Sequence, residues 1–154
     1  MTETAASGSV TLRPIEARDR RDWGRLWTDY LAFYDTSLPV SIHDTTFARL
    51  TGDDPALHGL IAEVDGRPSG LVHYIFHEHC WTPEGVTYLQ DLYADPEQRG
   101  IGLGRALIEA VYAAADAAGR PSVYWLTQDF NATARRLYDR VGRLSPFIKY
   151  TRPA

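Results

Sequence analysis

The sequence predicts an α/β fold organised around a mixed β-sheet. Residues 86–127 contain, in order, an extended segment, a glycine-rich turn, an amphipathic helical segment and a second apolar segment, which together predict a βαβ unit with parallel strands. Asp65-Gly66 is a strong hairpin signal between two other strand-like segments, and it predicts antiparallel pairing there. Helical and extended periodicities also alternate along the rest of the chain, as expected for this class.

Length and composition favour one domain. The 154 residues suffice for a substantial core, and we expect the domain to span residues 9–154, after a small, polar and mobile N-terminus at residues 1–8. The net charge of −4 disfavours nucleic acid as a partner. Cys80 is the single cysteine, so no internal disulfide can form, and a reducing, cytoplasmic setting fits. No segment resembles a membrane span or a signal peptide, so we expect no membrane partner.

The N-terminal part predicts one strand and two helices. Residues 9–14 alternate as in a strand, and Asp19 is the expected N-cap of the first helix. Leu38-Pro39 ends that helix, and residues 41–50 form a second one with Ser41 as its expected N-cap. Aromatic and leucine side chains recur at steps of three and four along the first helix: Trp23, Leu26, Trp27, Tyr30, Leu31 and Tyr34.

Two interpretations of this aromatic stripe stay open. The whole stripe can pack into the core, as most such stripes do. Alternatively, its far end, Tyr30 to Tyr34, lines a substrate pocket, because tyrosine offers an apolar ring and a polar hydroxyl.

Residues 58–64 and 69–81 predict the two strands of the hairpin. On the second strand, His73, His77 and His79 share one face. A metal site is disfavoured, because residues four apart on an extended chain are too distant to bind one ion. We therefore expect a polar or solvent-facing strand face and no metal. Glu78 and Glu84 are candidates for holding a cationic substrate.

The C-terminal half continues the sheet. Residues 86–94 form a strand that reaches a turn at Asp95-Pro96, and residues 103–118 form a helix with an alanine-rich buried stripe, ended by Gly119 and Pro121. The apolar run at 122–127 predicts a strand covered on both faces. Asn131 is the expected N-cap of a last helix at 132–141, and residues 147–151 predict a closing strand.

Glycines stand where the first of these strands leads into the long helix. Gly100, Gly102 and Gly104 lie at the expected helix N-terminus, where free N–H groups and the helix dipole favour a negatively charged ligand. The turn therefore predicts a phosphate site. Its spacing matches neither the dinucleotide-binding fingerprint nor the P-loop.

Two motifs together carry a family resemblance. Arg99-x-x-Gly102-x-Gly104 follows the strand and Asp-Pro, and Asn131-x-x-Ala134-x-x-Leu137-Tyr138 comes some thirty residues later. In this combination the chain resembles the GNAT superfamily of acetyl-CoA-dependent N-acetyltransferases. The segment at 88–93, Tyr-Leu-Gln-Asp-Leu-Tyr, resembles the branch that acetylates polyamines, amino acids and other small amines.

The resemblance implies a fold and a reaction. The sheet would be mostly antiparallel, with a central parallel unit, a splayed strand pair and helices on both faces. Acetyl-CoA would be the co-substrate, and the primary amine of a small molecule would attack its thioester directly. Homodimers are frequent in the family, and the strand at 147–151 is a candidate for exchange between two copies.

The resemblance also assigns roles to residues. A backbone N–H near Leu92 or Tyr93 would polarise the thioester carbonyl. Tyr138 would act as the general acid for the CoA thiolate, the alternative being a core tyrosine. The implied cofactor contacts are Leu92, Tyr93, Ala94, Arg99, Gly100, Ile101, Gly102, Leu103, Gly104, Arg105, Asn131 and Ala134.

The general base and the acceptor site follow less directly. Asp91 is the first candidate base, because a carboxylate in mid-strand is costly unless it is paired or used; the alternative is an ion pair with Arg136 or Arg140. Polyamine-type relatives carry a glutamate where this chain has Gln90, which disfavours a polyamine. Besides Gln90, Tyr30 and Tyr34 are candidate substrate contacts. Two other functions stay open: acetylation of a peptide lysine or N-terminus, and CoA binding without catalysis.

Overall fold

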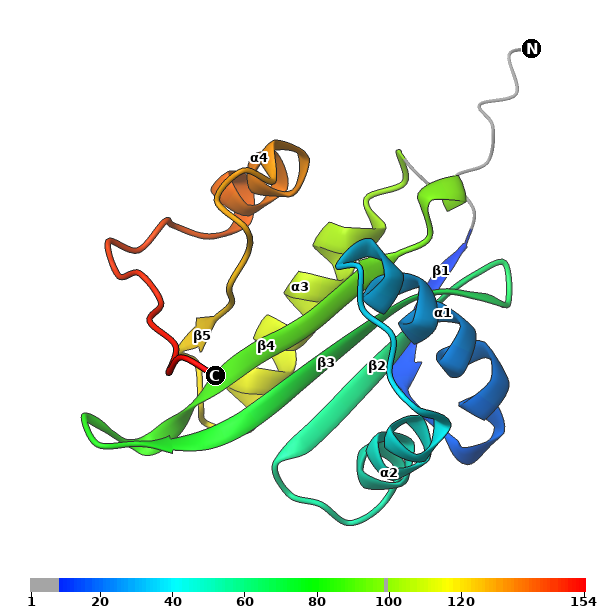
Figure 1. The fold of residues 1–154 in the computed structure, drawn as a ribbon, viewed down its shortest axis with the longest axis horizontal. Coiled ribbons are helices and arrows are strands. Elements are labelled where there is room, and N and C mark those ends of the chain that lie inside the picture. Colours follow the sequence, from blue (N-terminus) through cyan, green and yellow to red (C-terminus); the bar gives the residue numbers. More distant parts are fainter. Residues whose placement is uncertain (1–8, 99) are drawn as a thin grey trace.

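A computed structural model of the chain describes residues 9–98 and 100–154. The expected mobile N-terminus at 1–8 and the candidate cofactor contact Arg99 lie outside the described residues. Figure 1 shows the elements, which in chain order are β1 (Val10–Pro14), η1 (Ala17–Asp19), α1 (Arg20–Phe33), α2 (Val40–Thr51), β2 (Leu57–Val64), β3 (Arg67–His79), β4 (Thr82–Ala94), η2 (Pro96–Gln98), α3 (Leu103–Ala117), β5 (Val123–Tyr124) and α4 (Ala132–Val141).

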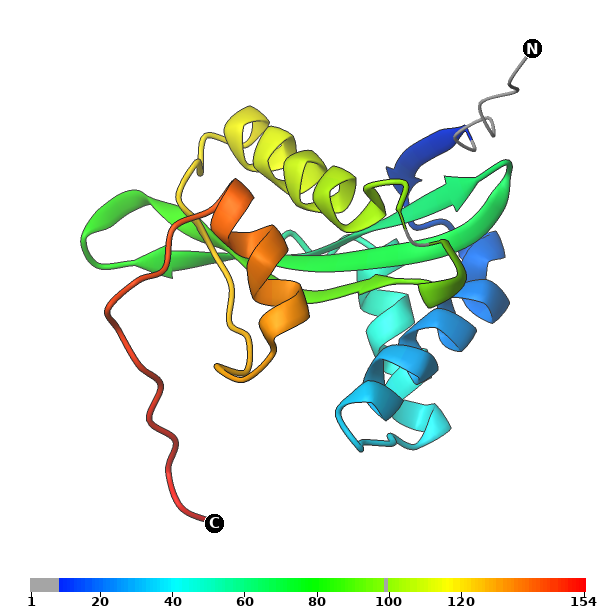
Figure 2. The same cartoon turned by 90° about the horizontal axis from the view of Figure 1, so that it is seen from above.

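The five strands form one mixed sheet in the order β1-β2-β3-β4-β5. The first three pairings are antiparallel, and β4 pairs with β5 in parallel across α3. Figure 2 shows α3 on one face of the sheet and α1 and α2 on the other. The predicted α/β class, the mostly antiparallel mixed sheet, the parallel βαβ unit and the helices on both faces are therefore confirmed.

Local backbone geometry explains the hairpin between β2 and β3. Asp65 and Gly66 both have positive φ, at 52° and 79°, as a type I′ turn requires. The predicted hairpin is confirmed. The β3 and β4 strands are each 13 residues long and extend as a long hairpin beyond the helices (Figure 1).

Each face of the sheet has its own apolar core. Leu103, Leu107, Ile108 and Val111 of α3 pack on one face. On the other face the stripe of α1 packs with α2, and it buries Trp23, Leu26 and Trp27 against β2 and β3. The core interpretation of the aromatic stripe is thus right for its first two turns. In the described part of the chain, no helix is long and apolar enough for a membrane crossing.

Four expected details of the helices and strands are wrong. Ser41 does not cap α2, which begins one residue earlier, at Val40, after Pro39. The predicted strand at 122–127 is reduced to β5, and Tyr124 is not covered on both faces. The chain leaves the sheet there because Trp125 packs against Tyr138 of α4, with ring centroids 5.5 Å apart.

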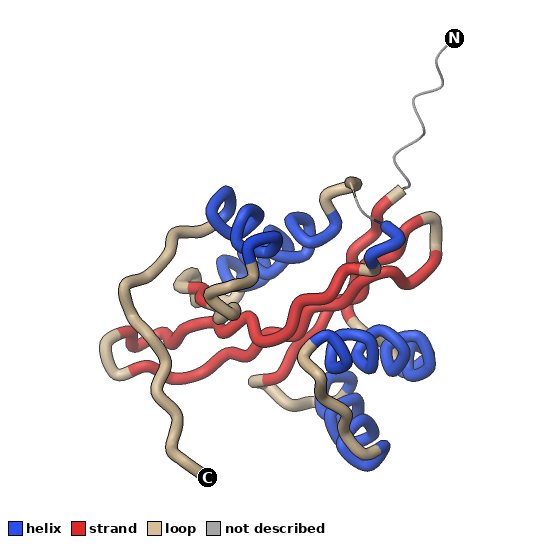
Figure 3. Tube along the Cα trace, turned by 45° about the horizontal axis from the view of Figure 1, so that its top comes forward, coloured by secondary structure: helices blue, strands red, loops and turns tan. Residues whose placement is uncertain are grey.

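The closing strand at 147–151 is also absent, since neither helix nor strand follows α4 within the described residues. Figure 3 shows this segment as loop, and Figure 2 shows it leading away from the layers. The adjacent β5 has two residues, which is too short a ladder to hold a further strand. Phe147, Ile148 and Tyr150 are left 84%, 78% and 89% exposed.

Asp19 precedes α1 as expected, but its side chain does not cap the helix. Its two oxygens accept from Arg13 Nη1 and Nη2 at 2.7 and 2.8 Å, and one also accepts from the Glu16 N–H at 2.7 Å. The Arg13 guanidinium lowers the pKa of this buried carboxyl below its usual value. Arg13 also pairs with Glu63 of β2, so the cluster fastens the start of α1 to the sheet.

Candidate active site

A β-bulge interrupts β4 in the middle of the sheet. His73 of β3 faces Asp91, but the next residue, Tyr74, faces Leu89, so Gln90 is an extra residue without a partner. Neighbouring residues of a regular strand point to opposite faces, whereas a bulge redirects side chains locally. Gln90 and Asp91 can therefore line the same pocket although they are adjacent in sequence.

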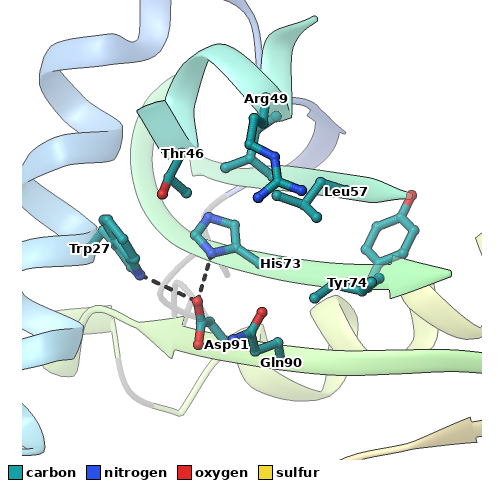
Figure 4. A pocket seen from close by; sticks show the side chains of 10 residues that line it. Trp27, Thr46, Arg49, Leu57, His73, Tyr74, Gln90 and Asp91 are labelled. Carbon is teal, nitrogen blue, oxygen red and sulfur yellow. Dashed lines mark hydrogen bonds and ion pairs between the residues drawn. The ribbon is translucent and has the colours of Figure 1, made fainter. Parts of the chain in front are cut away.

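This pocket has a volume of about 230 Å³ and lies between α1, α2 and the strands β2, β3 and β4. Figure 4 shows Asp91 and Gln90 on its floor, with the guanidinium of Arg49 directed into it from α2. Drug-sized ligands usually occupy about 300–1,000 Å³. The pocket is therefore suited to a smaller molecule. Its lining residues are Trp27, Thr46, Arg49, Leu50, Leu57, His73, Tyr74, Ile75, Gln90 and Asp91.

Asp91 is held by a buried network rather than by an arginine. Its Oδ2 lies 2.8 Å from His73 Nδ1 and accepts from Trp27 Nε1 at 3.3 Å (Figure 4). Among the described residues its ion-pair partner is His73, so the alternative of an ion pair with Arg136 or Arg140 is wrong.

His73 also departs from expectation. It is buried, not on a solvent-facing strand surface, and its Nε2 lies 2.9 Å from the indole Nε1 of Trp23. The bulge and α1 together explain this, because they enclose the middle of β3. In contrast, His77 and His79 lie toward the hairpin end, where His77 contacts the Tyr124 hydroxyl at 2.8 Å. Within residues 9–98 and 100–154, no cluster of three or more metal-ligating side chains is present.

Three tyrosines lie beside this network. The rings of Tyr30 and Tyr34 are 5.3 Å apart, and both burial and the negative charge of Asp91 raise the pKa of Tyr30. Burial raises the pKa of Tyr138 to about 12, with a smaller contribution from Tyr34. The structure therefore brings Tyr30 of α1, Tyr34 at the C-cap of α1, Asp91 of β4 and Tyr138 of α4 into one region.

One edge of β4 is open beyond its short pairing with β5. That pairing covers Thr87 and Tyr88, and from Leu89 onward no strand formed by residues 9–98 or 100–154 lies beside this edge. The Asp95 N–H donates to Ser69 O of β3 at 2.8 Å. Because alternate amides of a strand point to opposite edges, those of Leu92 and Ala94 point to the open edge. This is the expected splay of the strand pair.

The glycine turn ends beside this open edge. Gly100 and Gly102 have φ values of 84° and 73°, which favour glycine, and an added Cβ at either position would meet nothing within 4 Å. The first bond of α3 runs from the Ala106 N–H to Gly102 O, so the amides at 103–105 have no partner within the helix. The side chains of Ile101 and Leu103 pack into the core, and the backbone of both residues forms part of this turn.

The last two predicted contacts lie at the start of α4. Asn131 Oδ1 accepts from the Ala134 N–H at 3.2 Å, which confirms Asn131 as the N-cap. Gly104 lies so close to α4 that an added Cβ would be 3.2 Å from Leu137. The hydroxyl of Thr127 is buried with no hydrogen-bond partner among the described residues. A bound ligand with a polar group would satisfy it.

Sequence reasoning missed several residues of this site. Trp23 and Trp27 were expected as core side chains, and nothing in a helical stripe reveals that an indole N–H has a polar partner across the sheet. Arg49 and Thr127 belong to no recognisable sequence motif. His73 offered one usable signal, a histidine within an otherwise apolar strand segment, but its partner depends on the bulge.

Comparisons with known proteins agree with this geometry. The sequence matches the profile of the Acetyltransferase (GNAT) family over residues 18–142. It is 36% identical over 152 residues to the D-amino-acid N-acetyltransferase HPA3 of Saccharomyces cerevisiae, covering 97% of this chain and 94% of the relative. It is 29% identical over 145 residues to the thialysine N-epsilon-acetyltransferase of Mus musculus, covering 87% and 84%. The fold is similar to that of the aminoglycoside N-acetyltransferase AAC(6')-Iy in complex with CoA, with a TM-score of 0.83, 17% identity and 95% of each chain covered.

Proposed function

Since this chain belongs to the GNAT family of acetyltransferases, we propose that it transfers the acetyl group of acetyl-CoA to the primary amine of a small molecule. One observation carries this proposal: β4 presents the Asp91 carboxylate to a small pocket, and the next residues present the amides of Leu92 and Ala94 to an open edge that leads to the glycine turn. An acceptor and a cofactor can therefore meet on the same strand.

Acetyl-CoA would supply an activated acetyl thioester, and the groups present suit it. The amides at 100–105 would hold its pyrophosphate, since they stand at the N-terminus of α3. Arg99 belongs to the same proposed turn. The backbone at 92–94 would hold the pantetheine arm like an added strand. The amide orientation favours Leu92 over Tyr93 for polarising the thioester carbonyl. Asn131, Ala134 and the buried hydroxyl of Thr127 would line the other side.

Asp91 would act as the general base. An ammonium has no lone pair, so the acceptor must lose a proton before it attacks the thioester carbon. The Asp91 carboxylate lines the pocket and has its Oδ2 fixed by Trp27 and His73. It can take that proton directly or through one water.

Tyr138 would assist the leaving thiolate. Its pKa of about 12 keeps the phenol protonated at every working pH. A thiol has a pKa of about 8.5, so complete transfer of the phenolic proton to sulfur would be uphill. Tyr138 therefore acts by sharing its proton with the sulfur as negative charge develops there, the role of a weak general acid.

The pocket points to an acceptor that carries both an amine and a carboxylate. Asp91 and Arg49 line the same small space with opposite charges. Arg49 pairs with Asp54 at 3.0 Å, but its side chain is partly exposed. Because of this exposure, its guanidinium is accessible to a further anion. An amino acid could place its carboxylate on Arg49 and its amine near Asp91 and Gln90. The small volume disfavours aminoglycosides and peptides.

A CoA-release assay over D- and L-amino acids, thialysine, polyamines, aminoglycosides and peptides tests the proposal. We expect turnover with amino acids and little with the larger acceptors. Turnover with peptides alone would favour the second function, acetylation of a peptide lysine or N-terminus. Tight acetyl-CoA binding with no acceptor in the whole panel would favour a non-catalytic CoA-binding module instead.

Arg49→Gln separates carboxylate recognition from the chemistry. We expect the KM for an amino acid to rise about 1.5- to 5-fold, as for loss of a partly exposed ion pair worth about 0.2–1 kcal/mol. The decarboxylated amine of the same side chain is the internal control, and its KM should not change. An equal rise for both acceptors would show that Arg49 does not bind the carboxylate.

The C-terminal segment supports a homodimer as part of this proposal. Its apolar side chains Phe147, Ile148 and Tyr150 stand in solvent although their sequence favours a strand. Pairing with the sheet of a second copy would bury them. A cytoplasmic location also remains part of the proposal, because the free thiol of Cys80 is exposed.

A further inference from the structure

His73 is the residue that the pocket first suggests as a base. It lines the pocket beside Asp91, and histidine is the usual proton acceptor of enzymes near neutral pH. The hydrogen bonds of its two ring nitrogens exclude that role, because both nitrogens already have a partner: Asp91 on one side and Trp23 on the other.

Trp23 decides the protonation state of this ring. An indole N–H can donate a hydrogen bond but cannot accept one. Trp23 Nε1 lies 2.9 Å from His73 Nε2, and Trp23 is fully buried. His73 Nε2 must therefore be the acceptor and carry no proton. The single proton of the ring is on Nδ1, from which it donates to Asp91 Oδ2 at 2.8 Å.

A second proton on His73 would be unfavourable in this setting. It would place an N–H on Nε2 against the N–H of Trp23, and a buried donor would lose its partner. On the β2 side the ring packs closely against Gly59, where an added Cβ would be 3.3 Å from the imidazole. Asp91 is then the remaining acceptor of the pair that can take a proton from the pocket.

We propose that His73 is a positioning residue: it is fixed by Trp23 as the neutral Nδ1–H tautomer and holds the carboxylate of Asp91 toward the acceptor. This rests on the proposed role of Asp91 as the base. The indole of Trp23 thus controls the reaction from a place that no substrate reaches. It prevents an imidazolium from forming beside Asp91, where it would weaken that carboxylate as a proton acceptor.

Other charged and titratable groups around the network come from α1 and α2. On α1, Arg20 lies over the Trp23 ring at 5.5 Å and pairs with Asp44, and the Tyr30 hydroxyl is close to Asp91. On α2, Arg49 reaches the pocket.

His43 of α2 is a second histidine close to the network. Its ring lies 4.8 Å from that of Trp27 and 5.9 Å from that of Trp23. Burial and the positive charge of Arg20 lower the pKa of His43. A titration of His43 would therefore fall below the usual imidazole range, and the variant His43→Asn identifies it.

The first test is independent of activity. Nitrogen NMR of the full-length protein reports the tautomer of each histidine directly. We expect the His73 signal, assigned by its loss in His73→Asn, to be that of a neutral ring with the proton on Nδ1. An imidazolium, or a proton on Nε2, would overturn the proposal even if the protein proves to be an active acetyltransferase.

The second test uses the pH dependence of kcat/KM with an accepted amine. Trp23→Phe removes the donor to Nε2 and leaves His73 free to take a second proton. We expect the variant to gain an acid limb that the unmodified protein lacks, because Nε2 no longer faces a fixed donor. The limb should disappear in the double variant Trp23→Phe/His73→Asn and persist in Trp23→Phe/His43→Asn.

Trp27→Phe is the matched control, since it also removes a buried indole of α1, but one that donates to Asp91 and not to His73. It should change the rate without adding the acid limb. A limb of the same size in Trp27→Phe, or none in Trp23→Phe, would refute the role given to Trp23.

If the Trp23→Phe variant does not fold, the NMR measurement of the His73 tautomer in the unmodified protein decides the proposal by itself. Absence of any acetyl transfer, with the expected tautomer, would overturn the proposed function and with it the positioning role, while leaving the hydrogen-bond assignment in place.

Discussion

Replacing Asp91 by asparagine separates the base from its surroundings. Asparagine has nearly the same shape, and its amide oxygen can still accept from His73 Nδ1. Hydrogen bonds to a charged acceptor contribute about 1.5–3 kcal/mol and neutral ones about 0.5–1.5 kcal/mol. The 2.8 Å bond from His73 should weaken most, and the 3.3 Å bond from Trp27 little. We therefore expect a loss of about 1–2 kcal/mol in stability, or roughly 2–8 °C in Tm for a domain of this size.

The expected effect on catalysis is much larger. Loss of a general base typically costs about 10²–10⁴-fold. The remaining activity should depend on acceptor that is already neutral in solution. For an alkylamine with a pKa of about 10, that fraction rises about tenfold for each pH unit between 7 and 9. The unmodified enzyme should change far less over this range, because its carboxylate removes the proton from the bound ammonium.

The assay is CoA release at pH 6–10 with thermal melting at each pH. Asp116→Asn, an exposed carboxylate on α3, is the control and should leave both the rate and the pH profile unchanged. If the Asp91→Asn variant loses activity by the same factor at pH 7 and pH 9, the residue does not remove the proton. If it loses none, Asp91 has no part in the reaction.

Three further predictions concern other parts of the chain. Tyr138→Phe should lower kcat by about 10- to 10³-fold while the Kd for acetyl-CoA holds; unchanged turnover would remove the phenol from the mechanism. A chain ending at Arg143 should be monomeric by light scattering where the full chain is dimeric, and a monomeric full chain would contradict the proposed pairing. The pKa of Asp19 is lowered by Arg13, so its contribution to stability is present above about pH 4 and is lost as the pH falls through the folded value. Asp19→Asn should therefore cost about 1–3 kcal/mol at pH 7 and progressively less in acid, and a constant difference in urea unfolding from pH 7 to pH 2.5 would disprove this linkage.

The sequence predicted those features that depend on local patterns. The hairpin at Asp65-Gly66, the glycine turn before α3 and the N-cap at Asn131 were all recognisable, because turn and cap chemistry is specified by neighbouring residues. The α/β class followed from their order. Their roles in binding acetyl-CoA remain predictions.

Features that depend on distant contacts were not predictable in this way. The bulge at Gln90 arises from the register between β3 and β4, which leaves no signature within β4 itself. The partners of Asp91 are 18 and 64 positions away, and neither is Arg136 or Arg140, the alternative partners that the sequence offered. The strand expected at 147–151 is absent although its local pattern favours a strand, because the described part of the chain provides no strand for it to pair with.

The bulge also has a consequence for the order of events in catalysis. In the proposed arrangement acetyl-CoA reaches β4 from its open edge, whereas the amine reaches it from the face covered by α1 and α2. In that arrangement neither substrate would block the other, and none of the described residues that line the pocket is a serine or cysteine able to carry the acetyl group between them. Both substrates must then be bound together before either product leaves. Initial rates measured against one substrate at several concentrations of the other should give intersecting, not parallel, double-reciprocal lines.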